Sequence, residues 1–522
     1  MNTGEFITIT AAIVPEREAV VFENTRLNFE ELNDRVNRLA NGLTDLGIGS
    51  GDRIATMDVN TNAMVEVIFA CAKIDAVFLP LNFRAKPEEI SFMLNDAEAK
   101  AVFAGSRYLD MLDSLRPETK TVDTYIAFEG SKDGWTEYEG IISSSADDEV
   151  FGTADEDDLA VLMFTAGTTG TPKGVMLSHN SFSSFILANV EPPDPETEEK
   201  NLLTVPLNHI AGLQAVMAAI YGGRTLIIHR QFDPVDWMKS VQNEKADRAM
   251  MVPTMLKNLM DHEEFGQYDL SSMKVITYGA APMPLEVIKK AMIELKGCKF
   301  INAFGQTEGA GTITMLSPDD HEIPEGLSEE ETEKRLKRLA SIGKALPDVE
   351  VRIVDEEGND VPVGESGEIV ARGPRLMKGY WNRSEANADT MRGGWLYTGD
   401  IAYFDDEGYI FISGRSKDFI KRGGEMIAPE EVEQCLMSHP SVDEAAIIGI
   451  QDVTWGERVR AVCVLRGDQE KPSEDDLIEY CRQRMSSFKK PESIVWVSEL
   501  PRNQMGKVLK NVLREEHSHP IE

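Results

Sequence analysis

The chain has 522 residues, too many for one compact core, so at least two domains are expected. Its 53 Lys and Arg residues stand against 89 Asp and Glu residues, giving a formal net charge of −36. This excess argues against nucleic acid or an anionic membrane as the main partner. An anionic ligand would need local Lys, Arg and backbone N–H groups to bind against the overall field.

The cysteines and the two termini bear on the cellular compartment. The five cysteines are odd in number, scattered and without C-x-x-C spacing, so they predict reduced, mostly buried thiols. The N-terminus "MNTGEFITIT" lacks the pattern of a secretory signal, and "HSHPIE" is not a peroxisomal address. No apolar run is long enough to span a bilayer. We expect a soluble, cytoplasmic protein with no integral membrane segment.

Residues 28–43 predict an early amphipathic helix. Asn28 can cap it, and Glu31 three residues later completes a capping box. One helical face then carries the apolar residues Leu32, Val36, Leu39 and Leu43.

Short apolar runs then follow at helix-length intervals. They occupy residues 53–59, 76–82, 100–105, 158–164, 201–207, 224–230, 248–253, 274–279 and 299–305. Near-continuous apolar strands separated by helical stretches indicate parallel sheets that are covered on both faces. The first three-fifths of the chain is therefore predicted to be α/β.

The pattern changes after about residue 345. Alternating segments around Gly-containing turns predict β-hairpins at 349–363 and 401–414, and the charged stretch 323–341 predicts an exposed helix. Beyond about 415–418 the pattern becomes a compact α+β domain, in which Pro429 opens one helix and Ser473 caps another. We thus expect an α/β N-terminal domain (1–416) with parallel-rich sheets and a β-hairpin subdomain, followed by a small, mobile α+β domain (417–522).

The segment "FTAGTTGTPKGVMLSH" (164–179) directly follows an apolar strand. Its small and hydroxyl residues are Thr165, Ala166, Gly167, Thr168, Thr169 and Gly170. Such a loop can point successive N–H groups at phosphate oxygens, and Lys173 adds a positive charge. It is not a P-loop, because Pro172 stands where the second glycine belongs and Gly174 replaces the Mg²⁺-binding hydroxyl. Taken alone, the loop could also be a flexible connection.

Five motifs occur in a fixed order along the chain. They are "TAGTTGTPKG" (165–174), "NAFGQTEG" (302–309), "YTGD" (397–400), "GRSKDFIKRGGE" (414–425) and "PRNQMGKV" (501–508). Together they resemble the adenylate-forming (AMP-binding) superfamily of acyl-CoA synthetases, peptide-synthetase adenylation domains and luciferases. The resemblance extends from the helix at residue 28 to Lys507.

The resemblance implies attack of a carboxylate on the α-phosphate of ATP, giving an acyl-adenylate and pyrophosphate. The protein must position two anions and stabilise the negative charge of the transition state. The loop 165–170 with Lys173 would hold the pyrophosphate. Glu308 and Thr165 would bind Mg²⁺, and Thr307 would contact phosphate.

The resemblance also implies a nucleoside pocket. Asp400 would accept both ribose hydroxyls, and Arg415 would be the second ribose contact. The adenine would be enclosed by Gly279, Ala280, Ala281, Asn302, Ala303, Phe304 and Gly305, with Phe304 stacking on the base.

The small domain would supply the remaining groups. Lys507 matches the family's catalytic lysine, which bridges the substrate carboxylate and the α-phosphate, and Lys417 matches the hinge. After rotation of the small domain, Gly423 and Gly424 would let a pantetheine arm pass. Lys489 and Lys490 are either contacts for coenzyme A (CoA) phosphates or a solvated pair.

The residue at position 209 bears on which molecule accepts the acyl group, and this residue is His209. It stands where amino-acid-activating domains carry Asp and where acyl-CoA synthetases place a gate on the acyl and pantetheine tunnel; a hydrogen-bonded core histidine is the alternative. We therefore predict a stand-alone acid–CoA ligase using ATP, Mg²⁺ and CoA. The alternatives are an enzyme that loads an acyl carrier protein and a catalytically dead nucleotide-binding homologue. A luciferase-like oxygenase is remote.

The acid would bind among residues 208–216, 252–256, 278–282 and 309–314. These segments contain no Lys or Arg to pair a second carboxylate. A largely apolar monocarboxylic acid is therefore expected: medium-chain, alicyclic or aromatic. Many proteins of this superfamily are dimers, so a homodimer is one of the expected assemblies.

Overall fold

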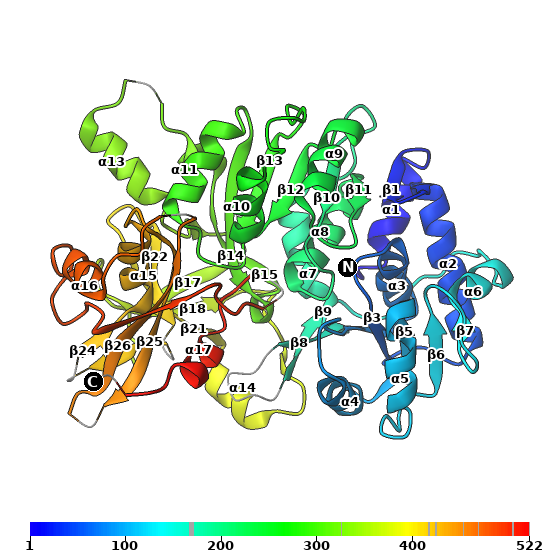
Figure 1. Ribbon diagram of the computed structural model, residues 1–522. Coiled ribbons are helices and arrows are strands. Elements are labelled where there is room, and N and C mark those ends of the chain that lie inside the picture. Colours follow the sequence, from blue (N-terminus) through cyan, green and yellow to red (C-terminus); the bar gives the residue numbers. More distant parts are fainter. Residues whose placement is uncertain are drawn as a thin grey trace.

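The computed structural model describes residues 1–165, 172–324, 326–415, 418–422, 425–452, 454–467, 469–503 and 506–520, with only the backbone described at 415, 425 and 426. Within these residues the strands form four sheets. The N-terminal elements lie at one end of the molecule and the C-terminal elements at the other (Figure 1).

The first sheet has nine strands, and its centre is parallel. Its order is β16 (Lys344–Ala345), β15 (Gly311–Leu316), β14 (Lys299–Gln306), β13 (Val275–Gly279), β12 (Arg248–Met251), β10 (Lys200–Leu203), β11 (Thr225–Ile228), β1 (Glu18–Phe22) and β2 (Thr25–Asn28). Antiparallel pairs occur at both edges.

The second sheet has eight strands and is parallel except at β8, β9 and β19. Its order is β19 (Gly379–Tyr380), β9 (Lys173–Ser178), β8 (Leu159–Thr165), β4 (Val77–Pro80), β3 (Arg53–Met57), β5 (Ala99–Ala104), β6 (Thr124–Ala127) and β7 (Thr136–Glu137). All nine apolar runs thus contain a strand of one of these two sheets, and the α/β prediction is confirmed.

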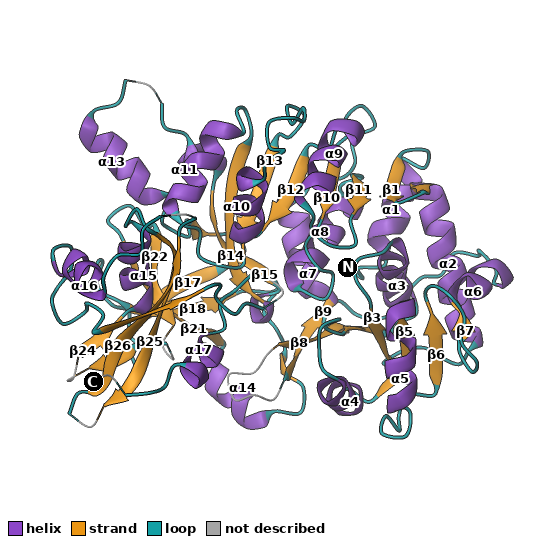
Figure 2. Cartoon of the chain, viewed as in Figure 1, coloured by secondary structure: helices purple, strands orange, loops and turns teal. Residues whose placement is uncertain are grey.

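Helices cover both faces of the two sheets (Figure 2). One apolar core joins both sheets to the helices between them: α1 (Glu5–Ile13), α2 (Phe29–Asp45), α3 (Asn62–Lys73), α6 (Tyr138–Ser144), α7 (His179–Asn189) and α8 (Ile210–Tyr221). A second core packs α9 (Pro234–Glu244), α10 (Pro253–Asp261) and α11 (Leu285–Glu294) on the outer face of the first sheet. A third packs α4 (Pro87–Asp96) and α5 (Leu109–Leu115) on the second.

Local signals place several helices where the sequence predicts them. Asn28 accepts the Glu31 N–H, and the Glu31 side chain accepts the Asn28 N–H, so the predicted capping box starts α2. The charged stretch forms α13 (Glu329–Arg338), which buries none of its residues. The five cysteines form no disulfide, and Cys71, Cys463 and Cys481 are buried.

The third sheet is antiparallel and contains β17 (Glu350–Val354), β18 (Gly367–Arg372), β21 (Trp395–Phe404), β20 (Met391–Arg392) and β22 (Ile410–Arg415). The predicted hairpin 401–414 is confirmed by β21 and β22. The hairpin at 349–363 is confirmed around its turn, where Val354 bridges Asp360 and the Val361 N–H donates to the Ile353 carbonyl at 3.1 Å, but its second arm forms no longer strand. β18 pairs with the other edge of β17, so that Val354 lies between Asp360 and Glu368.

The C-terminal domain, residues 418–520, has its own core. Two apolar clusters contain no buried residue from before Ile420. The sheet consists of β24 (Glu425–Ile427), β23 (Ile420–Arg422), β26 (Gly456–Leu465), β25 (Val442–Asp452) and β27 (Ser493–Val497). The helices α15 (Pro429–Met437), α16 (Glu474–Arg482) and α17 (Lys510–Glu516) pack on it, with Pro429 and Ser473 at the predicted helix starts.

The described residues also form four short helical elements: η1 (Ser106–Tyr108), η2 (Thr307–Gly309), α12 (Pro318–His321) and α14 (Ser384–Thr390). None of the helices in the described part of the chain combines the length and apolar character that crossing a membrane requires.

Candidate active site

The predicted nucleotide segments meet at one edge of the first sheet. The strands β12, β13 and β14 are parallel neighbours, so their carboxyl ends lie side by side. Residues 253–255 follow β12, 280–282 follow β13 and 307–309 follow β14. Ligands of open α/β sheets bind at this edge.

Close backbone approach explains two of the predicted glycines. A Cβ at Gly279 would lie 2.1 Å from the Ala303 carbonyl oxygen, and one at Gly305 would lie 1.7 Å from that of Gly311. Both positions therefore require glycine. Ala280, at φ +66°, packs partly buried in an apolar cluster with Val205, Ala211 and Val252.

The other predicted adenine residues lie on β14 and beside β13. The Asn302 amide donates to the Ser341 carbonyl at 3.1 Å. Phe304 packs partly buried against apolar residues of the third sheet, so it lies at the junction of the two sheets. Ala281 is partly exposed at the carboxyl end of β13.

A cation, a phenol and a carboxylate gather beside this edge. Glu308 lies in the 3₁₀ turn η2 (Thr307–Gly309), and its Oε1 accepts the Tyr380 hydroxyl at 2.8 Å. The Lys173 ammonium lies 5.1 Å from the centroid of the Tyr380 ring. Pairing of β19 with β9 sets this geometry, because Tyr380 is opposite Val175. Thr307 is buried next to Glu308.

Tyr380 was not predicted from the sequence. It is 72 residues from Glu308 in the chain, and the two are brought together by the β9–β19 pairing and by the Met377 N–H, which donates to the Glu308 carbonyl at 2.9 Å. The local sequence "GYW" (379–381) does not indicate that Tyr380 will contact Glu308.

The Gly/Thr loop leaves and rejoins the second sheet at adjacent positions. Thr165 ends β8, Lys173 begins β9, and the two are paired in the antiparallel ladder. The Thr165 hydroxyl donates to the Lys173 carbonyl at 3.5 Å. The predicted phosphate contacts between them, Ala166, Gly167, Thr168, Thr169 and Gly170, lie outside the described residues.

The two predicted ribose residues are neighbours. Asp400 on β21 is opposite Arg415 on β22, and Asp400 is 5% exposed. The Asp400 N–H donates to the Thr398 hydroxyl at 3.1 Å. The side chain of Arg415 and all of Lys417, Gly423 and Gly424 lie outside the described structure.

The loop of the predicted catalytic lysine contacts the N-terminal domain. Gly506, at φ +71°, lies so close to α10 that a Cβ there would be 2.4 Å from the Thr254 hydroxyl oxygen. The Lys507 N–H donates to the Asn503 side chain at 2.9 Å, which holds the turn. Thr254 follows β12, so this loop lies at the same sheet edge as the nucleotide segments.

His209 caps α8. Its Nδ1 accepts the Ala211 N–H at 3.2 Å, which leaves the ring proton on Nε2. Burial lowers the pKa of His209 to about 4, so the imidazole is neutral at physiological pH. The predicted gate residue is therefore a hydrogen-bonded cap with one N–H still available as a donor.

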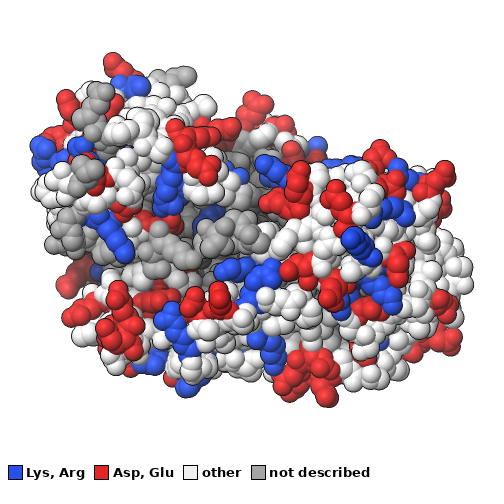
Figure 3. Space-filling view, turned by 90° about the horizontal axis from the view of Figure 1, so that it is seen from below, with Lys and Arg blue, Asp and Glu red and all other residues white. Residues whose placement is uncertain are grey.

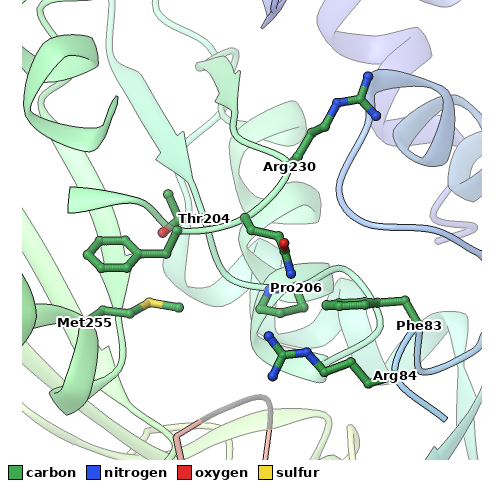
Figure 4. A pocket seen from close by; sticks show the side chains of 8 residues that line it. Phe83, Arg84, Thr204, Pro206, Arg230 and Met255 are labelled. Atoms are coloured by element: carbon green, nitrogen blue, oxygen red, sulfur yellow. The ribbon is translucent and has the colours of Figure 1, made fainter. Parts of the chain in front are cut away.

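A cavity of about 180 Å³ opens next to the Thr254 contact. It is lined by Phe83, Arg84, Thr204, Pro206, Arg230, Gln231, Phe232 and Met255 (Figure 4). The Thr204 hydroxyl is buried and has no partner in the described structure. Only Met255 belongs to the acid-binding segments expected from the sequence.

The two arginines of the cavity differ in their surroundings. Arg230 extends away from Pro206 and Met255 (Figure 4) and pairs with Glu23 at 2.6 Å and Glu129 at 2.7 Å. Arg84 forms no ion pair within the described residues; its guanidinium lies 5.5 Å from the Phe83 ring centroid. Sequence reasoning missed this cavity, although both of its arginines come shortly after a buried strand.

Comparison with known proteins agrees with this geometry. The family model "AMP-binding enzyme" matches residues 8–381, and "AMP-binding enzyme C-terminal domain" matches residues 431–507. Long-chain-fatty-acid–CoA ligase FadD13 of Mycobacterium tuberculosis is 34% identical, over 100% of this chain and 99% of its own. Feruloyl-CoA synthase of Amycolatopsis is also 34% identical, over 98% of both chains.

A solved structure is similar over almost the full length. The o-succinylbenzoate CoA synthetase of Bacillus subtilis, in complex with its acyl-adenylate intermediate, has a TM-score of 0.81 at 29% identity and covers 98% of this chain and 97% of its own. The chain therefore belongs to the AMP-binding enzyme family. The CoA ligases among its relatives differ in their acids but share one reaction class. Within the family this chain is an AMP-forming acid–CoA ligase.

Proposed function

We propose that the protein joins a largely apolar monocarboxylic acid (medium-chain, alicyclic or aromatic) to CoA in two half-reactions at one site. The acid first attacks the α-phosphate of ATP, releasing pyrophosphate and forming an acyl-adenylate. The CoA thiol then displaces AMP and forms the thioester. The observation that carries this proposal is the meeting of the Lys507 loop with the nucleotide segments at one sheet edge.

Each group has a role suited to its chemistry. Lys173 and the loop 165–170 hold the pyrophosphate, and Asp400 with Arg415 holds the ribose. Gly279 to Ala281 and Asn302 to Gly305 enclose the adenine. Lys507 bridges the carboxylate and the α-phosphate as a fixed positive charge, which stabilises the transition state without a proton transfer.

Glu308 and Thr165 fit a Mg²⁺ ion. The ion prefers oxygen ligands, and it is commonly held by one or two carboxylates together with substrate phosphates. Within the described structure the Glu308 side chain accepts one hydrogen bond, from the Tyr380 hydroxyl to Oε1. No group of three or more His, Cys, Asp and Glu residues suited to a metal occurs in that part of the chain, so ATP would complete the site. Bound Mg²⁺ would neutralise charge on the polyphosphate.

The cavity beside α10 suits the arm of CoA. It combines apolar walls with the guanidinium of Arg84, which has no ion-pair partner among the described residues, and CoA combines an extended pantetheine arm with phosphates. Met255 in its wall is adjacent to Thr254, which contacts Gly506. His209, with its remaining N–H, is the proposed gate between acid and thiol. Lys489 is less suited to phosphate, because Glu431 already holds it at 2.7 Å.

Lys417 is the proposed hinge between domains 1–416 and 417–522, with Gly423 and Gly424 moving to the pantetheine arm after rotation. We further propose a cytoplasmic enzyme and a homodimer.

Carboxylate-dependent ATP–pyrophosphate exchange tests the first half-reaction. A screen of acids of graded length and ring content should give exchange with apolar monocarboxylates, and thioester formation should follow when CoA is added. Exchange without thioester would favour transfer to a carrier protein. Absence of exchange with every acid would favour a nucleotide-binding homologue.

A further inference from the structure

An ion pair crosses from the N-terminal domain to the C-terminal domain. The Lys257 ammonium on α10 lies 3.2 Å from Asp443 Oδ2 at the start of β25. It also lies 3.4 Å from Asp261 Oδ2, one turn further along α10. Burial opposes the charge, but attraction to Asp443 and Asp261 raises the pKa of Lys257 overall. The Lys257 and Asp443 side chains are 31% and 27% exposed, so solvent screens the pair only in part.

On the C-terminal domain, polar contacts connect the segment of Asp443 to the loop that carries Lys507. Glu444, the neighbour of Asp443, holds Arg502 at 2.8 Å. Arg502 in turn donates to the Gly506 carbonyl at 2.5 Å, and Lys507 is the next residue. A short series of polar contacts therefore links the domain contact to the backbone of the lysine loop.

On the N-terminal domain, Lys257 belongs to α10, the helix against which the Lys507 loop packs. Thr254, against which Gly506 packs, and Lys257 are three residues apart on α10 and share one helical face. One face of one helix thus bears both the charge contact and the steric contact to the C-terminal domain.

We propose that Lys257 and Asp443 are positioning residues that stabilise the domain orientation in which Lys507 reaches the nucleotide. The inference rests on the proposed function, because it assigns the pair to the adenylation half-reaction. The partners lie on opposite sides of the proposed hinge, so rotation of the C-terminal domain separates them. The pair therefore favours one orientation and contributes nothing to the other.

Replacement of either partner by a neutral residue of similar shape tests the assignment. In Lys257→Met and Asp443→Asn, ATP–pyrophosphate exchange should fall about two- to fivefold, as expected for a partly exposed ion pair. Thioester formation from supplied acyl-adenylate and CoA should stay unchanged or increase. The double variant should lose no more exchange than either single variant, because the same interaction is removed.

Lys289→Met is the matched control. Lys289 pairs with Glu286 at 3.0 Å on α11, within one helix of the N-terminal domain. Its replacement should leave both half-reactions unchanged. Equal loss of both half-reactions in Lys257→Met, multiplied losses in the double variant, or unchanged exchange in both single variants would each overturn the proposal.

A carbodiimide that joins touching amines and carboxylates provides a readout that needs no turnover. Digestion and mass spectrometry should find a Lys257–Asp443 amide in the unmodified protein. CoA with a supplied acyl-adenylate should reduce its yield, while Lys289–Glu286 coupling stays constant. A yield that no ligand changes would contradict the orientation dependence. A ligand-dependent yield without exchange by any acid would refute the proposed function and the adenylation role of the pair, while the dependence of the Lys257–Asp443 contact on domain orientation would stand.

Discussion

Tyr380 joins the two halves of the proposed phosphate site, since its ring faces Lys173 and its hydroxyl holds Glu308. A carboxylate that binds Mg²⁺ must be fixed in orientation, and such partners strongly affect metal affinity. The hydroxyl of Tyr380 is therefore expected to matter for ATP use although it need not touch ATP.

Tyr380→Phe removes only that hydroxyl. A hydrogen bond to a charged group contributes about 1.5–3 kcal/mol, so exchange at subsaturating Mg²⁺ should fall about tenfold or more. Added Mg²⁺ should restore part of it. Tyr268→Phe is the matched control, because Tyr268 donates to Glu264 at 2.7 Å in a Tyr–Glu contact away from the site. Equal Mg²⁺ dependence in both variants would exclude the proposed role.

Lys507→Ala should separate the two half-reactions. Loss of a preorganised positive charge at the reacting centre costs about 10²–10³-fold in rate, so exchange should fall by that factor. Thioester formation from supplied acyl-adenylate should be retained, because the proposed rotation of the C-terminal domain would already have carried Lys507 out of the site. Both rates are measured on the same preparation, and an equal fall in the two would argue against domain rotation.

Arg84→Ala tests the CoA assignment of the cavity. Loss of a charge-assisted contact to phosphate should raise the KM for CoA about tenfold, with exchange nearly unchanged. Arg372→Ala is the control, since Arg372 pairs with the exposed Glu350 on the third sheet. A fall in exchange with an unchanged KM for CoA would assign the cavity to the acid instead.

At the scale of elements, α7 is fixed to the N-terminus through its first residue. His179 accepts the Thr3 N–H at 3.1 Å on Nδ1 and is 1% exposed. Burial lowers the pKa of His179 to about 4, from an ordinary value near 6.5. The unfolded chain therefore binds this proton at a higher pH than the folded protein does.

The stabilising contribution of neutral His179 is complete above about pH 6.5 and is lost as the pH falls toward 4. Between pH 7 and pH 5 the free energy of unfolding should fall by about 1–2 kcal/mol through this group. In urea unfolding of His179→Gln, the free energy of unfolding should differ less between pH 7 and pH 5, by about the same amount. The exposed His519→Gln should behave like the unmodified protein, and an unchanged difference in His179→Gln would refute the assignment.

The elements themselves were largely predictable from sequence. The nine apolar runs form strands because a strand buried on both faces is apolar throughout, and Asn28 with Glu31 carries its own helix start. The return arm at 359–363 pairs with β17 only near the turn, at Asp360 and Val361, although its alternation predicts a longer strand. The Tyr380–Glu308 contact and the cavity could not be predicted, since they depend on pairings between distant segments that leave no local pattern.

At the scale of the molecule, acidic side chains are interspersed with basic ones on the face shown in Figure 3. With a net charge of −36, the folded state carries considerable self-repulsion. Salt screens exposed charges beyond a Debye length of about 10 Å at 0.1 M and about 3 Å at 1 M. Exposed ion pairs contribute little, so relief of repulsion should dominate.

The unfolding midpoint should therefore rise by several degrees between 0.01 M and 1 M KCl. Differential scanning calorimetry measures this directly, and NaCl at the same ionic strength should give the same rise because the effect is one of screening. A midpoint that falls with salt would mean that the ion pairs outweigh the repulsion.

The nine-residue helix α10 has a consequence beyond its length. Its first turn holds Met255 in the cavity wall and Thr254 under the lysine loop, and the next turn holds Lys257. Because the helix is short and moves as a unit, a ligand that displaces Met255 would also shift Thr254 and Lys257. These two residues contact the C-terminal domain. If the cavity takes CoA as proposed, arrival of the thiol and departure of Lys507 would be coupled through this helix.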